Sequence, residues 1–303
     1  MYIKKTLQEL TLKDNFMFGA VMSEEANCKR LLELILGFPI ARIEVSKERS
    51  ITYHPDYKGV RLDVYAADEN NTRYNVEMQA AAEIALGKRS RYYHSQIDME
   101  LLQSGSSYSD LPDSYVIFIC DFDPFGERKY RYSFIPSCQE SPTARLKDGS
   151  CTIFLSTKGE NPDEIPGELR SFLEYVSADL EASARDFGDA YVKSLQRSVT
   201  LVKQNREMEQ RYMLLQELID AGRSEGYAEG ERRGEQRGEQ RGEQRGQRKE
   251  RTANILTLLE HKGTVSETLR LKITEETDLD MLENWFELAI ESDSVEQFER
   301  EIQ

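Results

Sequence analysis

The sequence predicts an α/β domain followed by a helical C-terminal region. Three observations lead to this prediction. Helix-like and strand-like runs alternate over the first part of the chain, one of the strand-like runs is almost entirely apolar, and helical spacing of apolar residues returns after about residue 166. We divide the chain into an α/β core at 1–140, a mixed and then helical extension at 141–221, a charged repeat at 222–250 and a small helical module at 251–303.

The first helix is expected directly after Asp14, a residue type that suits a helix N-cap. The polar stretch 23–27 divides the helical pattern in two. Gly37, followed by Pro39, is expected to end the second half, because glycine adopts the left-handed conformation that closes many helices.

Strand-like runs follow, rich in β-branched and aromatic residues. They begin at Ile40, Val60 and Arg73, and after a helical stretch from Ile84 to Leu102 at Ser114 and Tyr130. The run SYVIFICDF from Ser114 is nearly all apolar, as expected of a strand buried on both faces. The core therefore has the predicted order helix, three strands, helix, two strands, and a short apolar run at 151–155 remains unassigned in a mixed region.

Composition limits the function. The chain has 303 residues and a formal charge of −15, so it cannot coat nucleic acid nonspecifically, because phosphate binding depends on Lys and Arg. Any action on DNA must rely on a local basic rim and on metal ions. The four cysteines form no C-x-x-C pair and only three histidines exist, which argues against structural zinc and fits a reducing compartment. No signal-peptide block or long apolar run is present, and we expect a cytoplasmic protein that does not bind membranes.

Acidic side chains lie on two neighbouring strand-like runs. Asp63 lies in the run from Val60, and Glu77 and Gln79 lie in the next one, two residues apart and so on the same face. If 68–72 forms the hairpin loop, Ala67 pairs with Arg73, and four residues back along each strand Asp63 stands opposite Glu77. A loop one residue longer or shorter would move Asp63 to the other face.

In the first register two carboxylates converge, an oxygen-rich site suited to Mg²⁺ or Mn²⁺. Such an ion can activate a water molecule and stabilise charge on a phosphoryl group. The alternative is that both acids are ordinary solvated surface groups. Apolar residues alternate with Asp63 and Glu77 in both runs, which favours a polar face that lines a cleft.

Four segments in this order resemble the Rpn-type (recombination-promoting nuclease and transposase) branch of the PD-(D/E)XK superfamily: KDNFMFGAVM, GVRLDVYAAD, YNVEMQ and KRSRYYHSQ. The resemblance covers roughly residues 10–135, and the long helical tail with its repeat is also similar. It implies a restriction-endonuclease-like core with Asp63 and Glu77 as the metal-binding acids. The superfamily's usual lysine, two residues after the second acid, is Gln79 here, which can orient a water molecule but carries no charge.

Other residues could complete the site. Arg89 or Arg91 on the following helix could supply the missing positive charge, with Tyr93 and Gln96 on the same stretch; alternatively, these residues form a solvated helix face. Asp14 is a further candidate in this branch, besides its expected role as an N-cap.

The repeat has glycine at every fourth residue, with Gly-Glu-Gln-Arg as its central unit. On a helix these glycines would form a stripe that drifts about 40° per repeat, and each costs roughly 1 kcal/mol relative to alanine. A flexible linker, a helix that self-associates through this stripe and a nucleic-acid-binding arm are the alternatives, the last disfavoured because Glu nearly balances Arg. The glycines are Gly222, Gly226, Gly230, Gly234, Gly238, Gly242 and Gly246.

The residues and the resemblance together predict a Mg²⁺- or Mn²⁺-dependent DNA endonuclease that hydrolyses phosphodiester bonds. Asp63 and Glu77 would bind the metal, Gln79 would position the attacking water, and Arg89 or Arg91 would contact the phosphate. The family's name points to recombination or mobile elements. The alternative is a nuclease fold that has lost catalysis and acts as an oligomeric binding or regulatory module, with the C-terminal helical region joining the copies.

Overall fold

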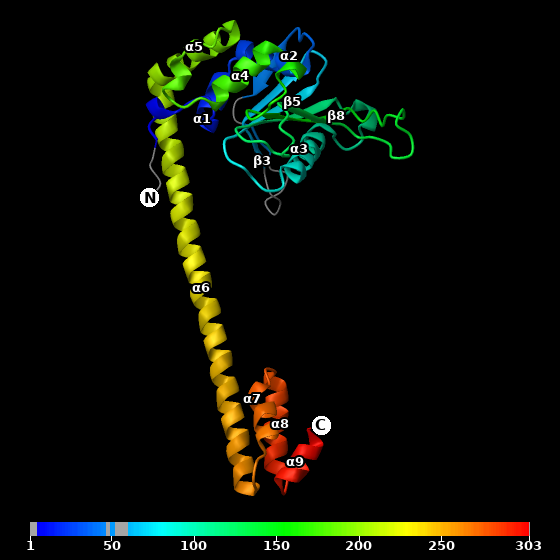
Figure 1. The fold of residues 1–303 in the computed structure, drawn as a ribbon, viewed down its shortest axis with the longest axis vertical. Helices are drawn as coiled ribbons and strands as arrows, with labels where there is room; N and C mark the ends of the chain where they lie inside the picture. The colour runs from blue at the N-terminus through cyan, green and yellow to red at the C-terminus, as the bar shows by residue number, and fades with distance from the viewer. Residues whose placement is uncertain (1–4, 47–48, 52–59, 303) are drawn as a thin grey trace. The chain divides into compact units, whose positions relative to one another are not determined.

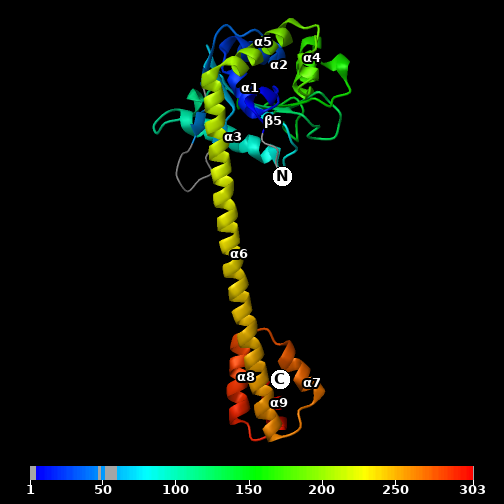
Figure 2. The same cartoon turned by 90° about the vertical axis from the view of Figure 1, so that its left-hand side faces the viewer.

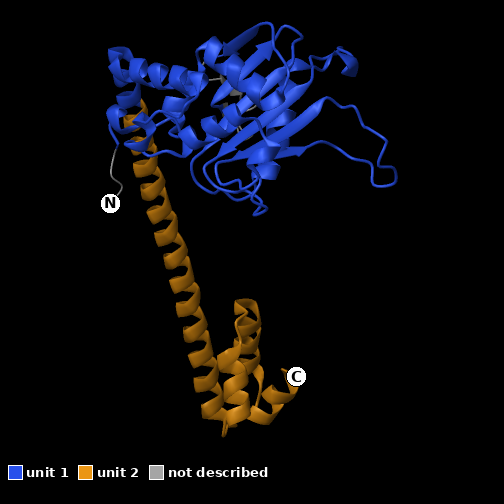
Figure 3. Cartoon of the chain, turned by 45° about the horizontal axis from the view of Figure 1, so that its top comes forward, with its two compact units in different colours: residues 1–214 blue, residues 215–303 orange. Residues whose placement is uncertain are grey.

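The computed structural model describes residues 5–46, 49–51 and 60–302 (Figure 1). The chain divides into two compact units, Met1–Leu214 and Leu215–Gln303, which are coloured separately in Figure 3. None of the helices in these described ranges combines the length and the apolar character that crossing a bilayer requires.

The helical pattern after Asp14 splits as predicted. Helix α1 spans Asn15–Met22 and helix α2 spans Glu25–Leu36. Gly37 ends α2 in the left-handed conformation, with φ of 80°, which is why glycine stands there.

Strands and one helix follow. Their bounds are β1 Ile43–Ser46, β2 Arg49–Ile51, β3 Val60–Leu62, β4 Val64–Asp68, β5 Arg73–Gln79, α3 Leu86–Leu101, β6 Ser114–Cys120, β7 Arg131–Phe134 and β8 Ser150–Ser156. The run expected from Ile40 thus becomes β1 and β2; residues 40–42 precede the first strand, and residues 47–48 and 52–54 lie outside the described ranges. The short apolar run at 151–155 forms β8.

Six of the described strands make one mixed sheet in the order β1-β4-β5-β6-β8-β7. β1, β4 and β5 are antiparallel neighbours, β5, β6 and β8 are parallel, and β7 returns antiparallel at the edge beside β8. The sheet therefore continues past residue 140, because β8 pairs along its whole length with the buried strand β6. β2 and β3 form a separate antiparallel pair.

Both faces of the sheet are covered by helices. On one face, residues such as Val76, Met78 and Ile117 pack in a large core together with α1, α2, α4 (Gly167–Ser177) and α5 (Ala190–Gln204). On the other, Val116 and Phe118 pack beneath α3. Figure 2 shows α1, α2 and α5 on one side of β5 and α3 on the other. The alternation within β6 explains its unbroken apolar sequence.

Helix α6, Arg206–Lys262, contains the whole glycine repeat. Its last turns pack with α7 (Glu267–Glu275), α8 (Leu279–Glu291) and α9 (Val295–Glu301) around a small apolar core that includes Leu259 and Trp285. The small helical module expected at the C-terminus is present.

Candidate functional site

The hairpin of β4 and β5 has the register that brings the two acids together. Ala67 pairs with Arg73 and Val64 with Val76, as predicted from a loop at 68–72. The next pair in this register would be Asp63 and Glu77. Asp63 does not continue the ladder, however, because it lies at the break between β3 and β4.

Asp63 and Glu77 are held by each other's segments. The backbone N–H of Asp63 donates to Oε1 of Glu77 at 3.2 Å, and the backbone N–H of Met78 donates to Oδ2 of Asp63 at 3.1 Å. Each carboxylate therefore accepts a hydrogen bond from a backbone amide of the other acid's segment. The break in the strand places two carboxylates side by side.

Glu77 is buried, with 1% of its surface exposed. Burial, together with the neighbouring charge of Asp63, raises the pKa of Glu77 to about 8, although the charge of Arg89 and the Asp63 amide act to lower it. With both acids ionised, the site would have more negative charge than the Arg89 guanidinium balances, and Glu77 therefore holds its proton at neutral pH. A divalent cation would relieve this excess.

Arg89 joins α3 to the acids. Its Nη2 lies 3.0 Å from Oε2 of Glu77. Its Nη1 donates to Glu83 at 2.6 Å and to Oε1 of Gln79 at 3.4 Å. Its Nε donates to the Tyr93 hydroxyl at 2.6 Å. Arg89 and Tyr93 are one helical turn apart, which is why both reach the same carboxylate. These contacts form a connected polar cluster at the carboxyl end of β5.

This cluster can be compared with known proteins. Residues 12–149 match the model of the PD-(D/E)XK nuclease family transposase. Residues 12–149 therefore form a domain of this family. Comparison with curated proteins and comparison with solved structures each found no match. The matched range starts just before α1 and ends just before β8, so it includes the strand break and the whole acidic cluster.

The PD-(D/E)XK domain has an uncharged side chain where the family pattern has its lysine. Gln79 is buried and lies on the same face as Glu77, two residues along β5. Its carbonyl oxygen faces the Arg89 guanidinium. Arg89 thus brings positive charge to the position beside the second acid, from a helix instead of from the strand.

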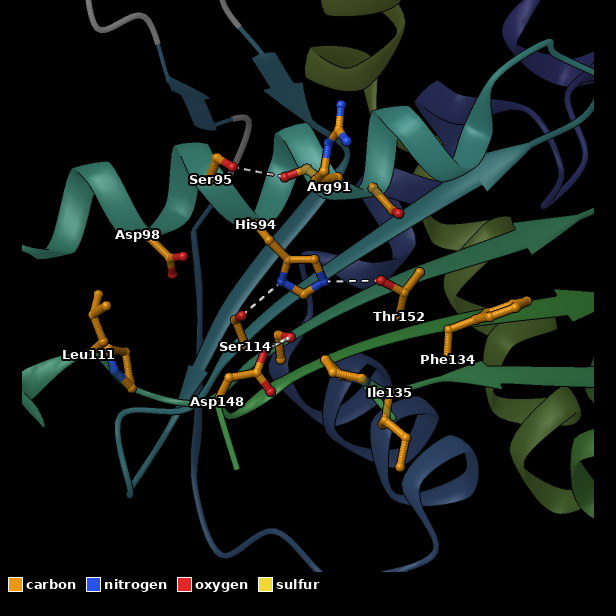
Figure 4. Close-up of a pocket in the computed structure, with 14 residues that line it drawn as sticks. Arg91, His94, Ser95, Asp98, Leu111, Ser114, Phe134, Ile135, Asp148 and Thr152 are labelled. Atoms are coloured by element: carbon orange, nitrogen blue, oxygen red, sulfur yellow. Dashed lines mark hydrogen bonds between the residues drawn. The ribbon is translucent and has the colours of Figure 1, made fainter. Parts of the chain in front are cut away.

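Arg91 does not join this cluster. It is exposed and lies two residues beyond Arg89, about 200° around α3, so it points to the opposite side of the helix. It lines a separate pocket of about 510 Å³ between α3 and the amino ends of β6 and β8 (Figure 4). The structure thus brings Arg89, and not Arg91, to the acidic pair.

His94 lies in the middle of this pocket between α3 and the amino ends of β6 and β8. Its Nδ1 lies 2.8 Å from the Ser114 hydroxyl and its Nε2 lies 3.1 Å from the Thr152 hydroxyl, as the dashed lines in Figure 4 show. Burial lowers the pKa of His94 to about 4. A neutral imidazole here links α3 to two parallel strands, which is a structural role.

The start of α1 brings Asn15, a residue that the sequence analysis did not single out, close to the acids. Asp14 occupies the N-cap position, but its carboxylate accepts from the Thr11 amide at 2.7 Å and from Lys5 at 2.8 Å instead of capping the helix. The next residue, Asn15, has its amide nitrogen 3.5 Å from Oδ2 of Asp63. Nothing in the local pattern distinguishes Asn15, because its contact depends on how α1 crosses the end of the sheet.

The donor set suits a hard cation. Across the described ranges no group of three or more His, Cys, Asp or Glu side chains is placed to hold a metal ion. Mg²⁺ keeps several waters and is commonly bound through one or two carboxylates together with substrate phosphates. Asp63 and Glu77 supply two carboxylates, and the Gln79 amide oxygen lies beside them. The residues present therefore fit Mg²⁺ or Mn²⁺.

Proposed function

We propose that this chain is a metal-dependent DNA endonuclease that hydrolyses phosphodiester bonds. The observation that supports this most strongly is the strand break that places Asp63 beside the buried Glu77, in a domain of the PD-(D/E)XK nuclease family. Asp63 and Glu77 would hold Mg²⁺ or Mn²⁺. The bound ion would activate water and offset negative charge on the phosphate.

Residues around the acids would position the water and bind the phosphate. Gln79, through its amide, orients the attacking water near the acids. Arg89 has two roles: without substrate it donates a hydrogen bond to Glu77, and with substrate its guanidinium binds a phosphate oxygen, for which its planar fork is suited. Tyr93 keeps the guanidinium in place through its hydroxyl and its ring, whose centroid lies 5.1 Å from the guanidinium carbon.

Supercoiled plasmid incubated with the full-length protein and Mg²⁺ or Mn²⁺ tests the proposal. We expect nicking or linearisation by the wild type and none by Asp63→Ala. Asp163→Ala is a matched control, because Asp163 is an exposed acid in a short turn away from the cluster, and it should cleave normally. Undiminished cleavage by Asp63→Ala would refute the assignment.

A second candidate is a nuclease fold that binds metal without cleaving. The observation that favours it is Gln79 in the lysine position, with Arg89 engaged by Glu77, Glu83 and Tyr93 as well in the free protein. Calorimetric binding of Mn²⁺ that Asp63→Ala abolishes, with no plasmid cleavage under any metal, would support this candidate over the first.

We also infer that α6 pairs with the α6 of a second copy. In the repeat, no atom of the described residues outside the helix's own nearby backbone lies within 4 Å of where a Cβ would be on any of its glycines, so no contact in that part of the chain explains them. On a helix the Arg row lies about 60° to one side of the glycine stripe and the Glu row about 100° to the other. In a parallel pair each Glu row faces an Arg row, whereas in an antiparallel pair like charges face each other.

Light scattering of the full-length chain tests this pairing. Replacing Gly234, Gly238 and Gly242 together by Ala should make the helix more stable, by roughly 1 kcal/mol per site, yet block close approach and yield monomers. The matched control replaces Gln236, Gln240 and Gln244 by Ala, on the side of α6 away from the stripe, and should remain a dimer. Equal mass for the two variants would refute the pairing.

A further inference from the structure

The proposed function leaves open how an acidic chain, with a formal charge of −15, holds a polyanion. The answer should lie near the acidic pair, where three parallel strands end side by side. The backbone N–H of Asp121, just after β6, donates to the Gln79 carbonyl at 2.9 Å, and that of Thr157, just after β8, donates to the Cys120 carbonyl at 3.0 Å. The edge that begins at Gln79 therefore continues without a gap to Thr157.

Two lysines share one carboxylate on this edge. Asp121 accepts from Nζ of Lys13 at 3.1 Å, from Nζ of Lys158 at 3.0 Å and from the Thr157 hydroxyl at 2.8 Å. Although burial raises the pKa of Asp121, these hydrogen bonds and the charge of Lys13 lower it overall. Asp121 is therefore ionised, and the group of two ammonium ions and one carboxylate has a net charge of about +1.

Both ammonium groups keep donors for a further partner. Among the described residues Lys13 donates to Asp121 and to the Ser177 carbonyl, and Lys158 donates to Asp121 alone, which leaves one and two N–H groups respectively. The side chain of Lys158 is 52% exposed. Lys129 differs, because it forms a one-to-one ion pair with Glu164 and contributes no net charge.

The spacing suits a DNA backbone. β5 and β8 are two strand intervals apart (Figure 1), about 10 Å at roughly 4.8 Å per interval. Successive phosphates of one DNA strand advance about 3.4 Å along the helix axis. Because successive phosphates also turn around this axis, they lie farther apart than this rise, and a duplex with one phosphate at Asp63 and Glu77 brings one of the next phosphates of the same strand to the lysines.

We propose that Lys13 and Lys158 form a phosphate-binding rim that holds the DNA backbone close to the bond that is cut, at one of the next phosphates of the same strand. This inference rests on the proposed nuclease function. Asp121 keeps both ammonium groups at the strand edge in the free protein, and the phosphate takes over one of its contacts when DNA binds. The rim supplies the local positive charge that the overall composition lacks.

Salt-dependent DNA binding tests the rim. Fluorescence anisotropy of a labelled duplex is measured with full-length protein that carries Asp63→Ala, in Mg²⁺, so that cleavage does not interfere. We expect Lys158→Gln to reduce the slope of log K against log salt by about 1, the value for one lost phosphate contact. Lys129→Gln is the matched control and should leave the slope unchanged. Equal slopes for Lys158→Gln and Lys129→Gln would overturn the rim.

Asp121→Asn separates the rim from a merely structural ion pair. Removing the carboxylate raises the local charge by one, so DNA affinity at low salt should rise, opposite to the effect of Lys158→Gln. Reduced DNA affinity in folded Asp121→Asn protein would count against the proposal. The salt-slope measurement is repeated with Lys13→Gln if its circular dichroism spectrum shows that this variant folds. If it does not fold, the variant of the exposed Lys158 alone provides the test.

The two proposals can fail separately. Plasmid cleavage by the wild type without any slope change in Lys158→Gln would overturn the rim and keep the nuclease. A reduced slope without plasmid cleavage would keep the rim and overturn the nuclease. Absence of DNA binding by every variant, including Lys129→Gln, would overturn the rim.

Discussion

Replacing Glu77 by Gln should stabilise the metal-free protein at neutral pH while it removes metal binding. The substitution keeps the shape of the side chain and removes its charge. In the wild type, burial and the charge of Asp63 raise the pKa of Glu77 from 4.5 to about 8, so folding at pH 7 requires this carboxyl group to take up a proton. Glutamine does not have this requirement.

The size of the effect follows from these two pKa values. At pH 7, 2.5 pH units above the ordinary pKa of 4.5, proton uptake costs about 3 kcal/mol at about 1.4 kcal/mol per pH unit. Against this, the new amide nitrogen would meet Arg89, another donor, and the lost hydrogen bond costs on the order of 1–2 kcal/mol. The variant should therefore be more stable by about 1–2 kcal/mol at pH 7.

The stability difference between Glu77→Gln and the wild type should increase with pH. Because the pKa of Glu77 is raised in the folded state, burial of this group does not lower the unfolding free energy of the wild type below pH 4.5. It lowers this free energy to the full extent above about pH 8. The difference in unfolding free energy between variant and wild type should grow by about 3 kcal/mol from pH 5 to pH 8. The loss of the Arg89 hydrogen bond does not titrate in this range, so it shifts the curve without changing its slope.

Hydrogen exchange of peptides from β5 and β6, measured in EDTA, would give these free energies. Fluorescence would not, because the single tryptophan, Trp285, packs in the C-terminal unit. Addition of Mg²⁺ should then protect β5 in the wild type and not in Glu77→Gln. A difference between the two proteins that stays constant from pH 5 to pH 8 would refute the reasoning.

Two further predictions concern the arginine and the histidine of α3. Arg89→Ala should lower the single-turnover cleavage rate about 100-fold, a typical cost of one lost charged donor, and Gln79→Lys in the same protein should restore part of it, because both side chains reach the same place. No rescue would mean that the positive charge acts elsewhere. His94→Gln should remove a pH dependence of stability: the pKa of His94 is lowered from 6.5 to about 4, so the wild type loses about 1–2 kcal/mol as pH falls from 7 to 5. Exchange of β6 and β8 peptides at the two pH values measures this loss, and an equal loss in the variant would contradict it.

The hairpin that carries the acids could be predicted because its turn chemistry is local. Asp68 accepts hydrogen bonds from the amides of Asn70 and Thr72, both at 2.9 Å, and this motif fixes the loop length. The loop length fixes the register, and the register places Asp63 at the level of Glu77. The break of the strand at Asp63 could not be foreseen, because it depends on contacts with Met78 and Asn15.

The strand β8 was not predicted because its partner is distant in sequence. Its apolar run is short, and only pairing with β6 and β7 makes it a strand. On α3, too, the sequence could not decide between two candidates. Arg89 and Arg91 are the same residue type, and only the orientation of the helix over the sheet places Arg89 beside the acids. The composition of the repeat left a flexible linker and a helix open as alternatives. The structure has a continuous helix, for which the three good helix formers between successive glycines suffice.

The outer edge of the sheet has a consequence for handling the protein. β7 is an edge strand with unpaired backbone groups on one side, and apolar side chains are exposed near it: Phe125 at 42%, Phe134 at 47% and Ile135 at 61%. An open apolar edge is a template for strand addition and aggregation. β7 is only four residues long, and Pro136 follows shortly after its end, so the template is short. These features limit edge-to-edge growth without abolishing it, which makes Ile135 the first position at which a charged residue should improve solubility.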